Sequence, residues 1–344
     1  MNITFLIGNG FDINLGLKTR YTDFYPFYLK KDHEDMLSKA ILDNYDNWAD
    51  LELALGQYLH NLVPEQIEAF LDSKGLLEDD LVEYLKDQEK RIGALDVKAY
   101  AEFLKRLAGF YMEFSAKERN AFLEWQKRVP SVIRYQFISF NYTRLLDQIL
   151  DGAKKASFPA SHTHSNTKYQ DELGEIIHIH GTLSGNLILG INDAGQISNP
   201  SLREQANLTE YIVKPIVNES LGEQLMDIAK RTIDDSDYVC VYGMSLGETD
   251  VIWWEYLLDW LKNKSTRRLV LYIYEGGQSS SSGQQKMRRI NRWKNVFLDR
   301  AKASSDIIDK LRAQIIVLTG SKIFDNPYVE LLPGETENRV KELV

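Results

Sequence analysis

The stretch that decides the fold is NITFLIGNGFDINLG, residues 2–16. Residues 2–7 are almost entirely apolar and predict a buried strand, and a helix is expected to open near Ile13. Between them lies the turn Gly8-Asn9-Gly10-Phe11-Asp12. A helix N-terminus carries backbone N–H groups without helical partners, so we expect this turn to aim several N–H groups at one point, as a bound phosphate requires.

Glycine suits this turn for two reasons, because a Cβ would block the approach of an anion and because tight turns often require positive φ. The spacing is not that of the dehydrogenase fingerprint G-x-G-x-x-G, and the chain contains no G-x-x-x-x-G-K-[ST] motif. A purely structural interpretation stays open, in which Asp12 caps the helix and the glycines only tighten a connection.

The composition indicates a folded protein whose main ligand is neither nucleic acid nor an anionic membrane, and it leaves room for a local basic patch. At 344 residues and 44% hydrophobic content, the chain is long enough for a large core or two domains. Its net charge of -9 argues against a protein that coats an anionic polymer or surface, and no apolar stretch approaches the ~20 residues of a membrane span. The single cysteine, Cys240, lies in an apolar run and permits neither an internal disulfide nor a four-thiolate zinc site. We therefore expect a cytoplasmic protein with Cys240 in its core.

Residues 22–130 predict a large all-helical insertion after the first strand. This region has few β-branched runs, and its apolar residues recur at three- and four-residue spacing. The remaining residues, 1–21 and 131–344, are then expected to form one α/β nucleotide-binding domain. Most charges of the insertion are interpreted as solvated. The exception is Glu52, which bulky neighbours such as Trp48 could carry inward.

After the insertion, apolar strands alternate with helices, which is typical of a parallel sheet covered on both faces. We therefore predict an α/β fold with a doubly wound, mostly parallel, Rossmann-like sheet. Strands are expected at 135–140, 176–181, 237–243, 268–274 and 314–319, with another apolar run at 187–190. Helices are expected at 144–150, 252–260 and 284–302, and residues 202–232 are expected to be mostly helical. A polar loop is expected before residue 174 and a flexible loop at 276–283.

Polar or glycine-rich junctions follow four of the predicted strands. In open parallel sheets, ligands bind beyond the carboxyl ends of the strands, so four such junctions on one edge predict a binding site. The junctions are Gly8–Asp12, Asn141–Thr143, His180–Gly181 and Gly243–Asp250.

The order of these junctions resembles the sirtuin-like superfamily. A G-x-G turn follows the first strand, an asparagine and then His-Gly follow later strands, and a G-x-S-L-x-x-x-D turn comes late in the chain. Five segments together are similar to the AbiH-type bacteriophage abortive-infection proteins: IGNGFD at 7–12, WADLE at 48–52, FNYT at 140–143, HIHG at 178–181 and YGMSL at 242–246.

This resemblance implies a sirtuin-like domain that binds NAD and hydrolyses its nicotinamide–ribose bond, which would starve an infected cell of the cofactor. Gly8, Asn9 and Gly10 would hold the diphosphate, while Gly243, Ser245 and Asp250 would hold the adenosine half. Asn141 would orient the nicotinamide ribose and the attacking water, and His180 would accept a proton from a ribose hydroxyl or from water. The predicted set is completed by Phe11, Asp12, Thr143 and Gly181 as cofactor-binding residues and by Glu52 and His178 as supporting residues.

His178 lies two residues before His180, so strand alternation would place both imidazoles on one face. No metal is expected. A phage-derived trigger and a second copy of the chain are the expected partners besides NAD.

The chain departs from the sirtuin-like pattern at three positions. Asn9 replaces the usual alanine, and Asp12 stands where serine is common. Thr143 stands where many relatives have an aspartate beside the asparagine. The paired Cys-x-x-Cys zinc module of protein deacetylases is absent, which argues against acyl-lysine removal.

Two alternatives to an NAD glycohydrolase stay open. The pairs His162/His164 and His178/His180, with Asp171 or Asp193, could hold the ion of a metal-dependent nucleotide or phosphodiester hydrolase. Alternatively, the protein could bind NAD or ADP-ribose without turnover and act as a sensor, an interpretation that Thr143 favours. Capping roles for Asn141 and Asp250 are also compatible with the sequence.

Overall fold

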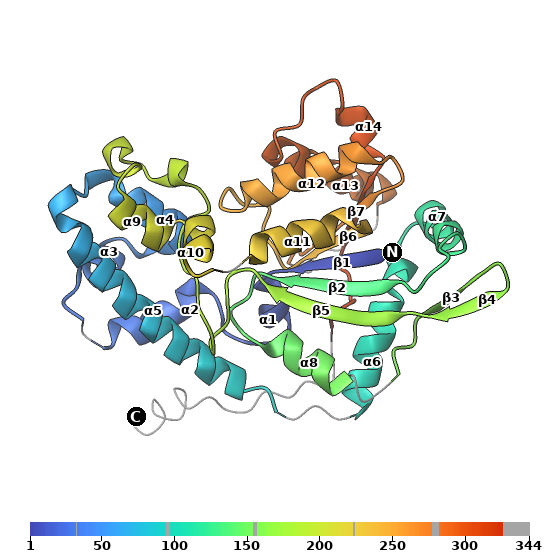
Figure 1. The fold of residues 1–344 in the computed structure, drawn as a ribbon, viewed down its shortest axis with the longest axis horizontal. Coiled ribbons are helices and arrows are strands. Elements are labelled where there is room, and N and C mark those ends of the chain that lie inside the picture. Colours follow the sequence, from blue (N-terminus) through green and yellow to red (C-terminus); the bar gives the residue numbers. More distant parts are fainter. Residues whose placement is uncertain (32, 94–96, 154–156, 223, 277–281, 326–344) are drawn as a thin grey trace.

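The computed structural model of the protein describes residues 1–31, 33–93, 97–153, 157–222, 224–276 and 282–325. At its centre lies a six-stranded sheet of order β5-β2-β1-β6-β7-β8, in which each neighbouring pair is parallel (Figure 1). Its strands are β1 Asn2–Ile7, β2 Arg134–Ser139, β5 Glu172–His178, β6 Ser236–Tyr242, β7 Arg268–Ile273 and β8 Ile315–Thr319. The first strand therefore lies in the middle of the sheet, where Leu6 is paired with Ile138 and with Val241.

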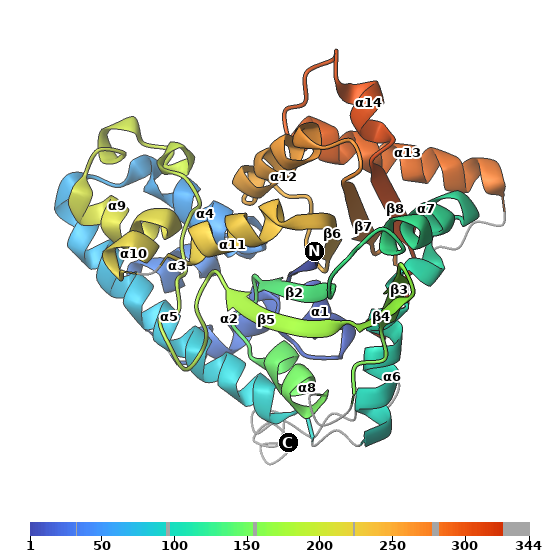
Figure 2. The ribbon, with the colours of Figure 1, turned by 45° about the vertical axis from the view of Figure 1, so that its right-hand side comes forward.

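Helices cover both faces of this sheet (Figures 1 and 2). One face packs against α11 Leu225–Asp234, α12 Val251–Asn263, α13 Gly283–Arg300 and α14 Ile308–Arg312. The other face packs against α1 Gly10–Asn14, α6 Val97–Ala108, α7 Ala116–Gln126 and α8 Leu145–Ala153. The central strands are consequently buried on both sides, as their apolar sequences predict, whereas the edge strand β5 is only partly buried. An α/β fold with a mostly parallel sheet is thus confirmed.

The remaining helices form a separate group beyond the carboxyl ends of the strands, which we term the helical lobe (Figure 1). It contains α2 Tyr21–Leu29, α3 Met36–Asp43, α4 Leu51–Tyr58, α5 Ile67–Lys90, α9 Ala206–Ile212 and α10 Lys214–Ser220. Short 3-10 helices lie at Tyr45–Trp48, Leu59–Asn61, Pro64–Gln66, Phe110–Glu113, Ala194–Gln196 and Pro200–Leu202. The lobe has its own apolar cluster, which Tyr142 joins from the end of the sheet. Within the described part of the chain, no helix is long and apolar enough to span a lipid bilayer.

Several local predictions are wrong in detail. The predicted polar loop contains a hairpin of β3 Ser161–His164 and β4 Thr167–Gln170, and α1 begins at Gly10 rather than at Ile13. The apolar run at 187–190, for which the sequence predicts no particular element, lies outside the strands, and its Leu189 is buried. Residues 202–232 are mostly helical, as expected, and contain α9, α10 and most of α11. Helices α9 and α10 are separated at Val213, which is extended before a helix that carries proline in its first turn. Of the loop at 276–283, residues 277–281 lie outside the described residues.

Candidate functional site

Two glycine turns interlock at the centre of the carboxyl edge. The N–H of Gly8 donates to the carbonyl of Tyr242 over 2.9 Å, and the N–H of Gly10 donates to the carbonyl of Gly243 over 2.7 Å. A Cβ on Gly10 would lie 2.5 Å from the Cα of Gly243. Glycine is therefore required here because two backbones touch.

This geometry corrects the expectation for the first turn. The N–H groups of Gly8, Gly10 and Phe11 all bond to backbone carbonyls, so these three are not free to bind a phosphate. Positive φ, which we expected for the turn, is found at Gly243, with φ of 71°, and at neither Gly8 nor Gly10. The side chain of Asn9 is also engaged, because its Nδ2 donates to the carbonyl of Thr19 over 2.8 Å.

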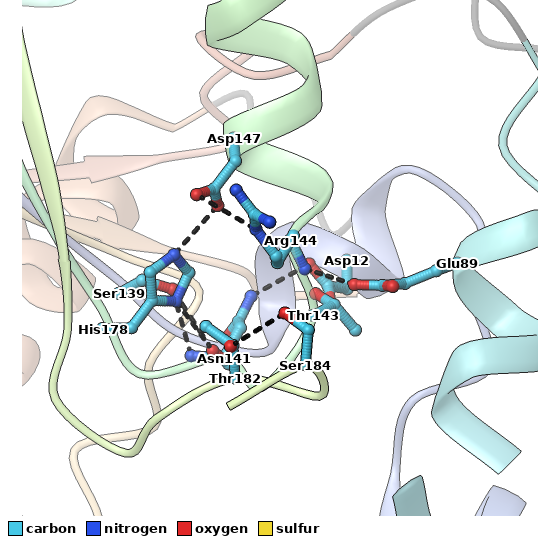
Figure 3. Close-up of polar contacts among 10 residues, drawn as sticks. All are labelled: Asp12, Glu89, Ser139, Asn141, Thr143, Arg144, Asp147, His178, Thr182 and Ser184. Atoms are coloured by element: carbon cyan, nitrogen blue, oxygen red, sulfur yellow. Dashed lines mark hydrogen bonds and ion pairs between the residues drawn. The ribbon is translucent and has the colours of Figure 1, made fainter. Parts of the chain in front are cut away.

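Asp12 lies buried at the start of α1 and joins the turn after β1 to the turn after β2. Its Oδ1 accepts a hydrogen bond from Asn141 Nδ2 over 2.9 Å, and its Oδ2 accepts one from the hydroxyl of Thr143 (Figure 3). The structural interpretation of the sequence allowed Asp12 to cap this helix. Its side chain does not do so, because the helix has no side-chain capping bond. Burial raises the pKa of Asp12 to about 7, and the bonds from Thr143 and Asn141 only partly offset this effect.

Asn141 follows β2 in a fixed orientation. Because its amide nitrogen is held by Asp12, its Oδ1 has a set direction, and this buried oxygen has no hydrogen-bond partner among the described residues. Its main chain is held as well, since its N–H donates to Ser139 Oγ over 3.2 Å and its carbonyl lies 3.4 Å from His178 Nδ1. The asparagine thus presents an unused acceptor on a rigid support.

His178 and His180 have different surroundings, contrary to the prediction that they share a face. Strand β5 ends at His178, so alternation does not continue to His180. The His178 Nε2 lies 2.9 Å from Asp147 Oδ2 of α8, and its Nδ1 contacts the main-chain carbonyl of Asn141 (Figure 3). The His180 ring instead lies near Lys214, whose Nζ is 3.4 Å from His180 Nε2.

Lys214 is a residue that the sequence interpretation missed. It begins α10, is 1% exposed, and its Nζ donates to Glu52 Oε1 over 2.6 Å. Burial, followed by the nearby charge of Lys214, holds the pKa of His180 well below its ordinary value, so its imidazole is neutral. A signal was present in the sequence, because Lys214 is a single charge within the apolar run YIVKPIV at 211–217.

Asp12, Asn141 and His180 line one pocket of about 380 Å³ between the carboxyl edge of the sheet and the helical lobe. The lobe contributes Glu52, whose Oε1 also accepts a bond from the hydroxyl of Tyr21 over 3.3 Å. The residues singled out from the sequence that line the pocket are Gly8, Asn9, Gly10, Asp12, Glu52, Asn141, Thr143, His180, Gly243, Ser245 and Asp250. The chain thus brings these eleven residues, drawn from distant segments, around a single cavity.

Three residues of the predicted set do not line this pocket. Phe11 is buried in the core, where its ring packs 5.4 Å from that of Phe324. Gly181 has φ of 72° and packs against Asn186, so it serves the turn after His180. His178 contacts the main-chain carbonyl of Asn141 and does not reach the pocket lining.

Asp250 closes the pocket on the side of α12. It precedes that helix without a side-chain capping bond. Burial raises the pKa of Asp250 to about 7, Glu52 adds to the rise, and Lys214 opposes it. Two carboxyl groups in one small pocket, Asp12 and Asp250, therefore titrate near neutral pH.

The histidines of the metal-site alternative are not brought together. His162 is buried against Asp171, with 2.8 Å between its Nδ1 and Oδ1, and its other ring nitrogen lies 3.1 Å from the carbonyl of Val129. His164 Nδ1 lies 2.9 Å from the carbonyl of Lys127. In the ranges that the structure describes, no three His, Cys, Asp or Glu side chains are grouped closely enough to hold a metal ion.

Fold and site together define an α/β protein with a mostly parallel six-stranded sheet and a polar pocket at its carboxyl edge. The family model for bacteriophage abortive infection AbiH matches residues 4–272, so the chain belongs to the AbiH family. The match contains every residue that lines the pocket. This membership associates the protein with abortive infection. Comparison with curated proteins gives no match.

Proposed function

We propose that this AbiH protein acts in abortive infection by hydrolysing the bond between nicotinamide and ribose in NAD. The observation that carries the proposal is the meeting of Asp12, Asn141 and a neutral His180 around one pocket. The sheet supports it too. Numbered among themselves in chain order, the parallel strands run 3-2-1-4-5-6, the order of doubly wound dinucleotide-binding sheets, which bind ligands where the order reverses.

The chemistry needs a proton acceptor, an orienting group and nearby negative charge. The bond between the ribose C1′ and the nicotinamide nitrogen breaks, and its electron pair goes to the ring nitrogen. A water oxygen bonds to C1′, and His180 accepts the released proton. The transition state resembles an oxocarbenium ion, so an ionised carboxyl group beside it is stabilising. The buried Asp12 and the half-buried Asp250 are able to supply that charge.

The pocket suits the nicotinamide–ribose half of NAD better than the diphosphate. About 380 Å³ lies near the lower end of the ~300–1,000 Å³ range of ligand pockets. Asn141 Oδ1 is an unused acceptor for a ribose hydroxyl or the attacking water. The diphosphate has less support, because the N–H groups of Gly8, Gly10 and Phe11 are already bonded.

The two departures at positions 12 and 143 compensate each other in this proposal. Where the sirtuin-like pattern has serine and aspartate, this chain has Asp12 and Thr143. The threonine hydroxyl donates to the carboxyl group of Asp12, which also holds Asn141. One carboxyl group therefore stays beside the asparagine, although it comes from a different turn.

The direct test is incubation of the purified protein with NAD while free nicotinamide is followed by chromatography. We expect release that is lost in His180→Ala and Asn141→Ala variants that remain folded. His164→Ala is the matched control, because this histidine lies outside the pocket. The assay is run both on resting protein and in extracts of phage-infected cells, which supply a trigger. Unchanged NAD under both conditions would refute the proposal.

A nucleotide sensor is the second candidate, and the position of Lys214 favours it. Its Nζ lies 3.4 Å from His180 Nε2, the atom that must accept a proton in catalysis. In that case, calorimetry would detect binding of NAD or ADP-ribose, while no nicotinamide would be released even in infected-cell extract.

A further inference from the structure

The pocket lining is acidic. Its lining contains four carboxyl groups and, among the described residues, neither lysine nor arginine; the four are Asp12, Asp50, Glu52 and Asp250. Lys214 lies next to the lining and is already paired with Glu52 over 2.6 Å. Three carboxyl groups therefore remain without a basic partner in the lining.

The pocket also contains a buried acceptor without a donor. Asn141 is 7% exposed, and its Oδ1 has no hydrogen-bond partner among the described residues. Because Asp12 fixes the amide nitrogen, the side chain keeps this oxygen as the group offered to a ligand. An unsatisfied buried acceptor is costly, so a ligand that donates a hydrogen bond here is favoured.

Aromatic rings complete the lining. Phe140 and Tyr142 lie next to His180, with ring centroids 5.5 and 6.2 Å from the imidazole, and Tyr21 lies beside Glu52. Aromatic faces attract cations, especially where water is excluded. Carboxyl groups and aromatic rings in one cavity favour a flat ligand that carries positive charge.

We propose that the pocket selects a cationic aromatic ring with a hydrogen-bond donor, so that the oxidised, positively charged nicotinamide group binds in preference to its neutral form. The choice of nicotinamide rests on the proposed function, whereas the preference for positive charge follows from the lining.

Binding of such a cation should release protons from the pocket. Asp12 and Asp250 have pKa values of about 7 without a ligand, so both are partly protonated at pH 7. A cation beside them would favour the ionised carboxylates, and its binding would release protons. The titratable groups that act on Asp12 are Glu89 and His178, and those that act on Asp250 are Glu52, Asp50 and Lys214. None of these gives either carboxyl group a direct ion pair among the described residues, so the ligand would be its first close cation.

The test uses two small probes that the protein cannot hydrolyse at a ribose bond: the 1-methylnicotinamide cation and neutral nicotinamide. Their binding to the full-length protein is measured by calorimetry at pH 7 in two buffers of different ionisation enthalpy. We expect the cation to bind at least about tenfold more tightly, a difference of ~1.4 kcal/mol. We also expect an apparent enthalpy that depends on the buffer, as proton release requires.

Asp50→Asn tests the role of charge without breaking the fold. Asp50 caps α4 by accepting a bond from the N–H of Leu53, and asparagine caps a helix equally well. The matched control is Asp35→Asn, because Asp35 caps α3 and does not line the pocket. We expect a reduced preference for the cation in Asp50→Asn and in Asp250→Asn, and an unchanged preference in Asp35→Asn.

Equal affinity for the two probes, or no binding of either, would overturn this inference. So would an equal loss of preference in Asp35→Asn. These results are independent of NAD turnover. A protein that prefers the cation but releases no nicotinamide from NAD would refute the proposed function and leave the charge selection intact.

Discussion

Thr143 donates its hydroxyl hydrogen to Asp12, a residue 131 positions earlier in the chain. The same carboxyl group accepts a bond from Asn141, so the turn after β1 and the turn after β2 are joined through one buried side chain. Both turns follow neighbouring parallel strands, which is why residues so distant in sequence meet. These two hydrogen bonds hold Asp12, Asn141 and Thr143, which all line the pocket, in fixed positions and set the direction of the Asn141 amide.

Removal of the Thr143 hydroxyl should lower the free energy of unfolding of the protein. Thr143→Val keeps the shape of the side chain but leaves one oxygen of a buried carboxyl group without its donor, whereas Thr143→Ser keeps the donor. Hydrogen bonds to charged groups contribute about 1.5–3 kcal/mol. We expect urea denaturation at pH 8 to show a loss of that size in Thr143→Val relative to Thr143→Ser. Equal stability of the two variants would mean that the bond contributes nothing.

The stability of the fold should fall as pH rises through neutrality, because of Asp12. Burial raises its folded-state pKa to about 7, above its ordinary value of 3.8, so the native state binds more protons than the unfolded state between these values. Its stabilising contribution is complete below about pH 4 and is lost as pH rises through 7. Asp12→Asn removes this titration. The free energy of unfolding of the wild type, minus that of Asp12→Asn, should decrease by up to about 1.4 kcal/mol per pH unit. Chemical denaturation from pH 5 to 8 measures it, and a difference that rises with pH would contradict the buried location of Asp12.

Gly10→Ala should disrupt the junction of the two glycine turns. The new Cβ would lie 2.5 Å from the Cα of Gly243, so a backbone would have to move. We expect a loss of at least about 1–3 kcal/mol, as for overpacked cores. Gly75→Ala is the control, because this glycine lies within α5 and nothing is within 4 Å of its added Cβ. There, alanine should stabilise the protein by about 0.5–1 kcal/mol. Thermal denaturation of both variants distinguishes a clash with Gly243 from a general effect of alanine, because only Gly10→Ala should lower the melting temperature.

Lys214→Met should raise the pKa of His180. The charge of Lys214 is the second cause of the low pKa of this imidazole, after burial, so its removal should shift the titration upward while burial keeps it below 6.5. Nuclear magnetic resonance of the ring protons measures this shift. The double variant Glu52→Gln/Lys214→Met controls for the carboxyl group that the single change leaves unpaired. An unchanged His180 titration in both variants would show that the lysine does not act on the imidazole.

The central strands were predictable from sequence because they are buried on both faces and therefore read as continuous apolar runs. Strand β5 was only partly predicted, since it lies at the edge of the sheet and begins with polar residues such as Glu172 and Glu175. The β3–β4 hairpin was missed because its strands are polar and its turn, Ser165-Asn166, reaches positive φ without glycine.

The location of the pocket was predictable for the same topological reason. Parallel strands end at one edge, so Gly8, Asn141 and Gly243 had to lie near one another. What local pattern could not show was the packing of the helical lobe, which brings Lys214 to His180 and Glu52. Nor could it show that the N–H groups of Gly8 and Gly10 bond to the backbone of the turn after β6.

The position of β1 between β2 and β6 affects the order in which a functional protein can appear during synthesis. Residues 2–7 emerge first from the ribosome, yet one of their two neighbouring strands ends at Tyr242, and the pocket is complete only with Asp250. A nascent chain shorter than this lacks one wall of the cavity. Under the proposed function, a nascent chain that ends before Asp250 is expected to be inactive, because part of its site has not yet been synthesised.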